Sequence, residues 1–206
     1  MAAKFAPALP YCGAAPDPST LWLRWNFDPK LVAILLMAAG IYAFGVSWAR
    51  ERPRRTTQAC FYAGWAVAAA ALLSPLCALS VSLLTARVGQ HVVLALIAAP
   101  LIAVGLSRAC SFPIGPLGAS VAFAALLWFW HAPAPYAATF RSDAVYWAMH
   151  VSMFGAAVWL WATLLNHASA QTMAAFLAGL VSTVTLEVVI ATEPVFATAM
   201  VASPRP

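Results

Sequence analysis

Three histidines are the residues of this sequence whose side chains could perform chemistry together. His91 lies near the start of one long apolar run, His131 closes a second run, and His150 lies under two turns inside a third. A neutral imidazole is a common ligand for copper, zinc and iron. If these runs are membrane helices packed side by side, their ends bring the three rings to one depth.

Other side chains at that depth extend the candidate site. Met153 follows His150 by three residues on the same helix face. Its thioether and the thiolate of Cys77 would suit Cu(I). Ionisable groups within a membrane are costly and usually face a functional site. The candidate metal ligands are His91, His131, His150, Met153, Cys77 and Glu187.

Each candidate also has a simpler structural interpretation. His131 could have a structural role alone, ending a helix and donating a hydrogen bond to a carbonyl. Met153 could pack in the core without binding anything. Glu187 could pair with Arg87 or Arg141. Two of the histidines could instead be axial ligands of a haem iron, which would make the protein an electron carrier.

The composition decides the class of protein that positions these residues. Hydrophobic residues make up 64% of the chain and charged residues 8%, with a mean hydropathy of +0.85. A soluble domain carries roughly 25% charged residues. The sequence therefore predicts an all-α integral membrane bundle, with the lipid bilayer as a partner. No hydrolase, metalloprotease, P-loop or nucleic-acid-binding pattern occurs, so we expect neither an enzyme nor a nucleic-acid partner.

We expect a proline-rich leader over residues 1–30, a bundle over 31–192 and a short polar tail over 193–206. A helix of about 20 residues crosses a membrane, and about six such spans are expected. They are residues 31–49, 59–79, 88–106, 114–130, 144–165 and 172–192. A linker over 80–86 and a loop over 132–143 separate some of them. Pro100 lies inside the third span, where neighbouring helices would satisfy the carbonyl that a proline frees.

One charge cluster suggests an orientation. Four arginines, Arg50, Arg52, Arg54 and Arg55, share the loop after the first span. The positive-inside rule puts this loop in the cytoplasm. The N-terminus and the three histidines would then lie on the outer side. The prolines of the leader interrupt any apolar stretch of the kind that a signal peptide needs.

The order of several motifs resembles the CtaG family of multi-span cytochrome c oxidase assembly factors, found in bacteria with caa-type and related oxidases. The motifs are Ser74-Pro75-Leu76, Leu83-Leu84, Gln90-His91, Pro100, the W-x-W-H-x-P-x-x-Y block from Trp128 to Tyr136, and His150. The resemblance covers about residues 60–165. It implies a protein of the bacterial plasma membrane that helps to mature a haem–copper oxidase, by a route that involves copper delivery.

The resemblance also implies a set of site residues. His91, His131 and His150 match histidines of the family pattern, and the other matching positions are Gln90, Trp130, Pro133 and Tyr136. The chain departs from the pattern at Arg87 and Val88, where the family has His-Met. An arginine there would oppose a metal cation. The family's usual final segment is also not seen after the sixth span. A permanent oxidase subunit without metal therefore stays open as an alternative.

Overall fold

The computed structural model describes residues 10–106 and 115–166, and residues 174, 178, 179 and 182 of the last expected span. Its elements are a 3-10 turn Leu21–Leu23, α1 Pro29–Trp48, α2 Arg55–Leu73, α3 Leu76–Ser82, α4 Leu84–Val93, a π-helical turn Leu94–Ala98, α5 Ala99–Leu106, α6 Pro116–His131, α7 Pro133–Ala138 and α8 Asp143–Asn166. Four stretches of this part are long and apolar enough to cross a membrane: α1, α2, the continuous α4–α5 and α8. The expected all-α membrane bundle is confirmed. The sixth span, with Glu187, lies outside the described residues.

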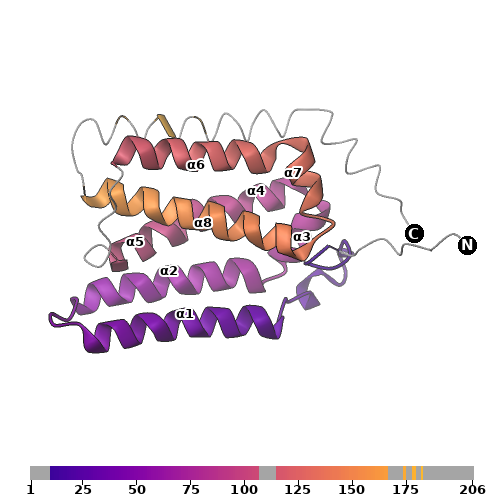
Figure 1. Ribbon diagram of the computed structural model, residues 1–206. Helices are drawn as coiled ribbons and strands as arrows, with labels where there is room; N and C mark the ends of the chain where they lie inside the picture. The colour runs from indigo at the N-terminus through magenta and orange to yellow at the C-terminus, as the bar shows by residue number, and fades with distance from the viewer. Residues whose placement is uncertain (1–9, 107–114, 167–173, 175–177, 180–181, 183–206) are drawn as a thin grey trace, which may run out of the picture.

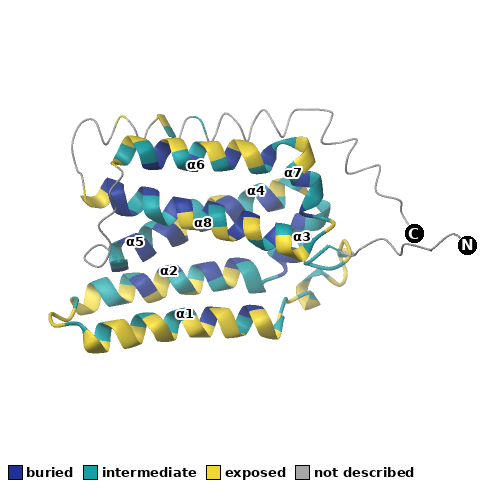
Figure 2. Ribbon diagram, in the orientation of Figure 1, coloured by how far each residue is buried: buried dark blue, intermediate teal, exposed yellow. Residues whose placement is uncertain are grey.

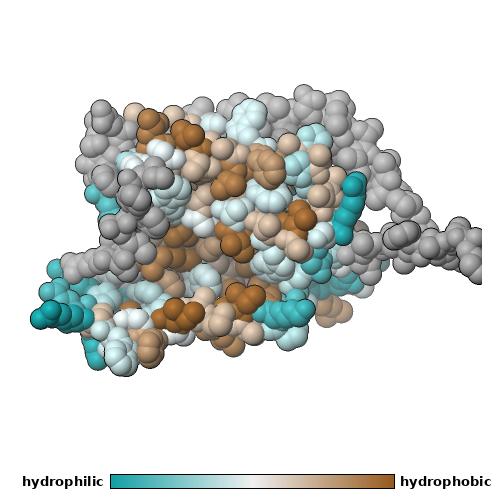
Figure 3. All heavy atoms as spheres, viewed as in Figure 1, coloured by the Kyte–Doolittle hydropathy of each residue, from teal (hydrophilic) through white to brown (hydrophobic). Residues whose placement is uncertain are grey.

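The long helices run side by side, and the connections gather at two opposite ends (Figure 1). One end, which we call the histidine end, comprises residues 10–28, α3, α7, the last turn of α6 and the first turns of α4 and α8. The loop with the four arginines lies at the opposite end. Hydrophobic residues spread over the side of the bundle, as contact with lipid requires (Figure 3).

Prolines set several helix boundaries that the sequence analysis placed wrongly. The second span was expected to continue to Leu79, but α2 ends at Leu73 because the residue before Pro75 avoids the helical region. The expected linker over 80–86 is mostly helical, and the extended Leu83 alone separates α3 from α4. The expected loop over 132–143 contains α7, which has Pro133 in its first turn.

The third span passes Pro100 through a wider turn. The backbone N–H of Ala99 bonds to the carbonyl of Leu94, five residues earlier. In that register the carbonyl of Ala95 would need an N–H from Pro100, which has none. Trp161 of α8 donates its indole N–H to this carbonyl instead, at 2.8 Å. The expectation that a neighbouring helix satisfies the freed carbonyl is confirmed.

Close packing of α2 on α5 depends on two glycines. A Cβ on Gly64 would lie 2.7 Å from the carbonyl oxygen of Ala98, and one on Gly105 would lie 2.5 Å from Cβ of Phe61. Small residues allow helix backbones to approach closely in membranes. Ala99 of α5 and buried residues of α6 and α8 form one apolar cluster, and the buried residues of these helices are dark blue in Figure 2.

Candidate functional site

The three histidines meet at the histidine end. The ring centroid of His91 in α4 lies 5.7 Å from that of His131 in α6 and 5.4 Å from that of His150 in α8. All three side chains are buried. The sequence prediction that they share one level is confirmed.

Two of the rings are oriented by their own helices. The Nδ1 atom of His131 lies 2.7 Å from the carbonyl oxygen of Leu127, and Nδ1 of His150 lies 3.1 Å from that of Tyr146. A carbonyl only accepts hydrogen bonds, so each neutral ring carries its hydrogen on Nδ1. The lone pair is then on Nε2, and metal-binding histidines are commonly fixed by such a bond from the other nitrogen. The structural interpretation of His131 as a donor to a carbonyl is thus confirmed, and it is compatible with a ligand role.

Several buried nitrogens around these rings lack hydrogen-bond partners within the described part of the chain. They are both ring nitrogens of His91 and Nε2 of His150. Leaving a buried polar group unsatisfied costs roughly 1–3 kcal/mol. A ligand or water at these atoms would remove that cost.

A small cavity adjoins the side chains of His91 and His150. Its volume is about 40 Å³, and His91, His150 and Met153 contribute to its otherwise apolar wall. A water-sized site needs roughly 10–15 Å³, so one ion or water fits. Pockets for larger organic ligands measure roughly 300–1,000 Å³. The described cavity is therefore sized for an ion or a water molecule.

No group of three or more His, Cys, Asp and Glu side chains in residues 10–106 and 115–166 is arranged to hold a metal ion. Cys77, expected as a thiolate ligand, instead forms a disulfide with Cys12 in this structure. A sulfur in a disulfide is not a thiolate. The two cysteines are 65 residues apart, and no spacing pattern in the sequence pointed to this pair.

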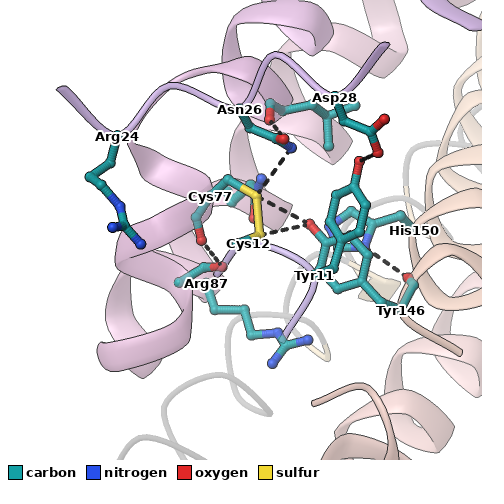
Figure 4. The surroundings of a disulfide bond; sticks show 12 residues. Tyr11, Cys12, Arg24, Asn26, Asp28, Cys77, Arg87, Tyr146 and His150 are labelled. Atoms are coloured by element: carbon teal, nitrogen blue, oxygen red, sulfur yellow. Dashed lines mark hydrogen bonds between the residues drawn. A yellow bond between two sulfur atoms is a disulfide. The ribbon is translucent and has the colours of Figure 1, made fainter. Parts of the chain in front are cut away.

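The disulfide lies next to Tyr146 and on the same side of the molecule as His150 (Figure 4). The hydroxyl oxygen of Tyr146 is 3.5 Å from Sγ of Cys12 and 3.8 Å from Sγ of Cys77. Because disulfide sulfurs carry no hydrogen, the hydroxyl is the donor. The Tyr146 ring also stacks on that of Tyr11, with 4.9 Å between the ring centroids, and contacts the tilted ring of His150, with 4.2 Å between centroids. Tyr146 thus connects the disulfide to the histidine cluster.

Arg87 occupies the same end as a buried cation, with 3% of its surface exposed. Its guanidinium donates to the Thr139 hydroxyl at 2.7 Å and lies 4.8 Å from the ring centre of Tyr136 and 4.5 Å from that of Phe140. These are cation–π distances. Arg87 thereby fastens α4 to α7 and the turn that follows it. The alternative pairing of Arg87 with Glu187 lies outside the described residues.

Other residues of the sequence pattern have identifiable structural roles. Gln90 donates from Nε2 to the carbonyl oxygen of Ala71 at 2.9 Å. Ala71 needs this donor because Pro75, four residues later, has no N–H. Trp130 donates to the Ser152 hydroxyl at 2.9 Å and links α6 to α8.

The N-terminal segment is fastened over this end. The Tyr11 hydroxyl donates to Asp28 at 2.7 Å, and the same carboxylate caps α1 by accepting from the N–H of Lys30. The hydrogen bond from Tyr11 holds the pKa of Asp28 below its ordinary value. Burial, and then the bond to Asp28, raise the pKa of Tyr11. The N–H of Asn26 bonds to the carbonyl of Leu73 and caps α2.

The fold and this site define a multi-span membrane protein with a buried polar cluster at one end. A family model described as cytochrome c oxidase caa3 assembly factor matches residues 40–112 and 106–206. These two matches cover more than half of the sequence, so the chain belongs to this family. Its members' role implies association with cytochrome c oxidase. No curated protein matches the chain, and no solved structure does.

Proposed function

We propose that this protein holds copper and passes it to a caa-type cytochrome c oxidase during assembly, with the copper bound by the histidines of the cluster. Two observations carry this proposal: the ring nitrogens of His91 and the Nε2 of His150 have no partner among the described residues, and both side chains line one small cavity. Met153 adds a thioether to the same wall, and imidazole with thioether ligands favours Cu(I). His131 completes the cluster from α6, and copper is cargo here rather than a resident cofactor.

The proposal includes an orientation in the plasma membrane. The histidine end faces the periplasm, and the arginine loop faces the cytoplasm. The charge of the loop favours this arrangement. The disulfide at the histidine end supports it independently, because such bonds persist in oxidising compartments such as the periplasm.

Metal analysis of the detergent-purified protein tests the proposal. We expect copper near one equivalent after loading with Cu(I), and its loss in the triple variant His91→Ala/His131→Ala/His150→Ala. The matched control is His167→Ala, the remaining histidine of the chain, which should keep the copper. Absence of copper from the loaded wild-type protein would contradict the proposal.

One observation favours a second candidate function. Arg87 is buried without a carboxylate partner among the described residues, and its charge opposes a cation nearby. In this second candidate function, the histidine end binds no metal and docks on a subunit of the oxidase. The triple variant would then lose co-purification with the oxidase, although the wild-type protein binds no copper. A Soret band in the purified protein would instead indicate the haem-binding electron carrier.

A further inference from the structure

We propose that Cys12 and Cys77, when reduced, form a two-thiolate Cu(I) site at the entrance to the histidine cluster. This inference rests on the proposed function, because it supplies the point at which copper would enter. The oxidised pair seen in the structure is then the closed form of the entrance.

The two cysteines have suitable positions. Their Cα atoms are 5.5 Å apart, so both sulfurs reach one small ion without a large backbone movement. Cys12 is partly exposed, whereas Cys77 is 1% exposed. An incoming reactant therefore meets Cys12 first.

The surroundings favour thiolates. The Tyr146 hydroxyl contacts both sulfurs, and the side-chain amide of Asn26 donates to Sγ of Cys77 at 3.8 Å. Donors aimed at a group that becomes negatively charged stabilise its charged form. Thiolates are the soft ligands that select Cu(I).

A continuous series of contacts leads inward from this pair. The ring of Tyr146 lies 4.2 Å from His150, whose ring lies 5.4 Å from His91. His150 lies on the same side of the disulfide as Tyr11 and Tyr146 (Figure 4). Tyr146 is therefore the side chain that touches both the sulfurs and the ring of His150.

Opening the pair requires a dithiol reductant, such as a dithiol oxidoreductase. One thiolate of the reductant attacks Sγ of Cys12, the bond between Cys12 and Cys77 breaks, and Cys77 leaves as a thiolate. The second thiol of the reductant then resolves the mixed disulfide. The reductant ends as a disulfide, and its two protons end on Cys12 and Cys77. Binding of Cu(I) displaces these two protons without a change in the oxidation state of the copper.

The test compares Cu(I) binding by the oxidised and the dithiol-reduced full-length protein, freed of excess reductant, in anaerobic competition with a chromogenic Cu(I) chelator. A Cys60→Ser/Cys110→Ser background removes the other two thiols and serves as the reference. We expect reduction to add about one Cu(I) ion per chain, with sulfur scattering in the X-ray absorption spectrum. Further substitution of Cys12→Ser and Cys77→Ser should abolish the increment.

The outcomes separate this inference from the proposed function. Equal Cu(I) binding before and after reduction would overturn the cysteine site, even if the histidines still bind copper. An increment that persists in the triple histidine variant would support the cysteine site, whatever that variant shows about the cluster. The comparison of redox states needs no substitution at Cys12 or Cys77, so a folding defect in the serine variant would not prevent a decision.

Discussion

The histidine end and α1 are attached to the rest of the molecule by different kinds of contact. At the histidine end, a disulfide, a buried arginine and several hydrogen bonds to helix carbonyls join five elements. On α1, only 11% of the span is buried. It is held by the stacking of Tyr42 on Phe61 and by hydrogen bonds from Trp65 to Leu35 and from Tyr42 to Gly105. A groove of about 600 Å³ with Ala38 and Val158 in its wall lies beside it.

This difference shows which helix interfaces are defined by specific contacts. Lipid tails are as apolar as leucine, so apolar area alone does not hold membrane helices together. Polar contacts and close packing specify the histidine end and the α2–α5 pair. The other side of α1 offers its large apolar residues outward, among them Ile34, Leu36, Met37, Ile41, Phe44 and Trp48.

The largest expected effect is an inversion of the orientation of the protein in the membrane. Replacing Arg50, Arg52, Arg54 and Arg55 together with glutamine removes the charge that favours the cytoplasm. A large fraction of the chains should then insert with the histidine end in the cytoplasm, where the Cys12–Cys77 disulfide does not persist. Reporter fusions and non-reducing gels measure both effects. The control replaces Arg24 and Arg141, and an unchanged orientation of the fourfold variant would refute the role of the loop.

The next effect concerns the cluster itself. We expect His91→Ala to lower oxidase activity in cells strongly, while the protein still inserts and accumulates. Loss of a ligand should weaken copper binding by at least the roughly 10–100-fold that loss of an outer partner causes. Val151→Ala is the control, because its side chain is 68% exposed next to His150 and is not part of the cavity wall. Wild-type oxidase levels in cells with His91→Ala would argue against a site at this end.

A pair of glycine substitutions compares the packing of α2 with that of α1. Gly64→Ala should destabilise the protein by about 1–3 kcal/mol, because the added methyl group collides with the carbonyl oxygen of Ala98 and with side chains of α5. At Gly40 in α1 no atom lies within 4 Å of an added Cβ. Gly40→Ala should therefore stabilise by up to about 1 kcal/mol through helix propensity. The measurement is the thermal unfolding temperature of both variants in detergent. Equal shifts of this temperature would contradict the difference in packing between α2 and α1.

The smallest effect is a dependence on pH where the N-terminal segment meets α1. Because the folded-state pKa of Asp28 is lowered, its stabilisation is complete above the ordinary carboxyl pKa, about 3.9, and is lost as the pH falls through the lowered value. Tyr11→Phe removes the main cause of that shift and should flatten the dependence. The measurement is thermal unfolding between about pH 6 and pH 2. Tyr62→Phe is a control on the exposed face of α2, and a profile for Tyr11→Phe as steep as the wild-type one would refute the link.

The sequence predicted the bundle and the meeting of the histidines because both follow from apolar run lengths and from positions near run ends. It did not predict α7, whose first turn contains Pro133, or the break at Leu83, which no neighbouring proline signals. Nor did it find the disulfide or the partners of Arg87, which join segments distant in the chain. One feature of the sequence could have predicted the contact of Tyr146 with His150. Tyr146 precedes His150 by four residues and so lies on the same helix face.

The π-helical turn at Leu94–Ala98 sets the rotational phase of the third span. Each residue of an α-helix turns the chain by about 100°, whereas the wider turn of a π-helix, closed by a bond between residues five apart, takes up one residue more. A regular α-helix over the same residues would turn Gln90 and His91 by about 100° relative to α5. Deleting Ala95 and restoring a regular helix would instead shorten the span by about 1.5 Å and leave both side chains facing their present neighbours. The turn thus allows the third span to carry one additional residue between α5 and the histidine cluster without turning the cluster away.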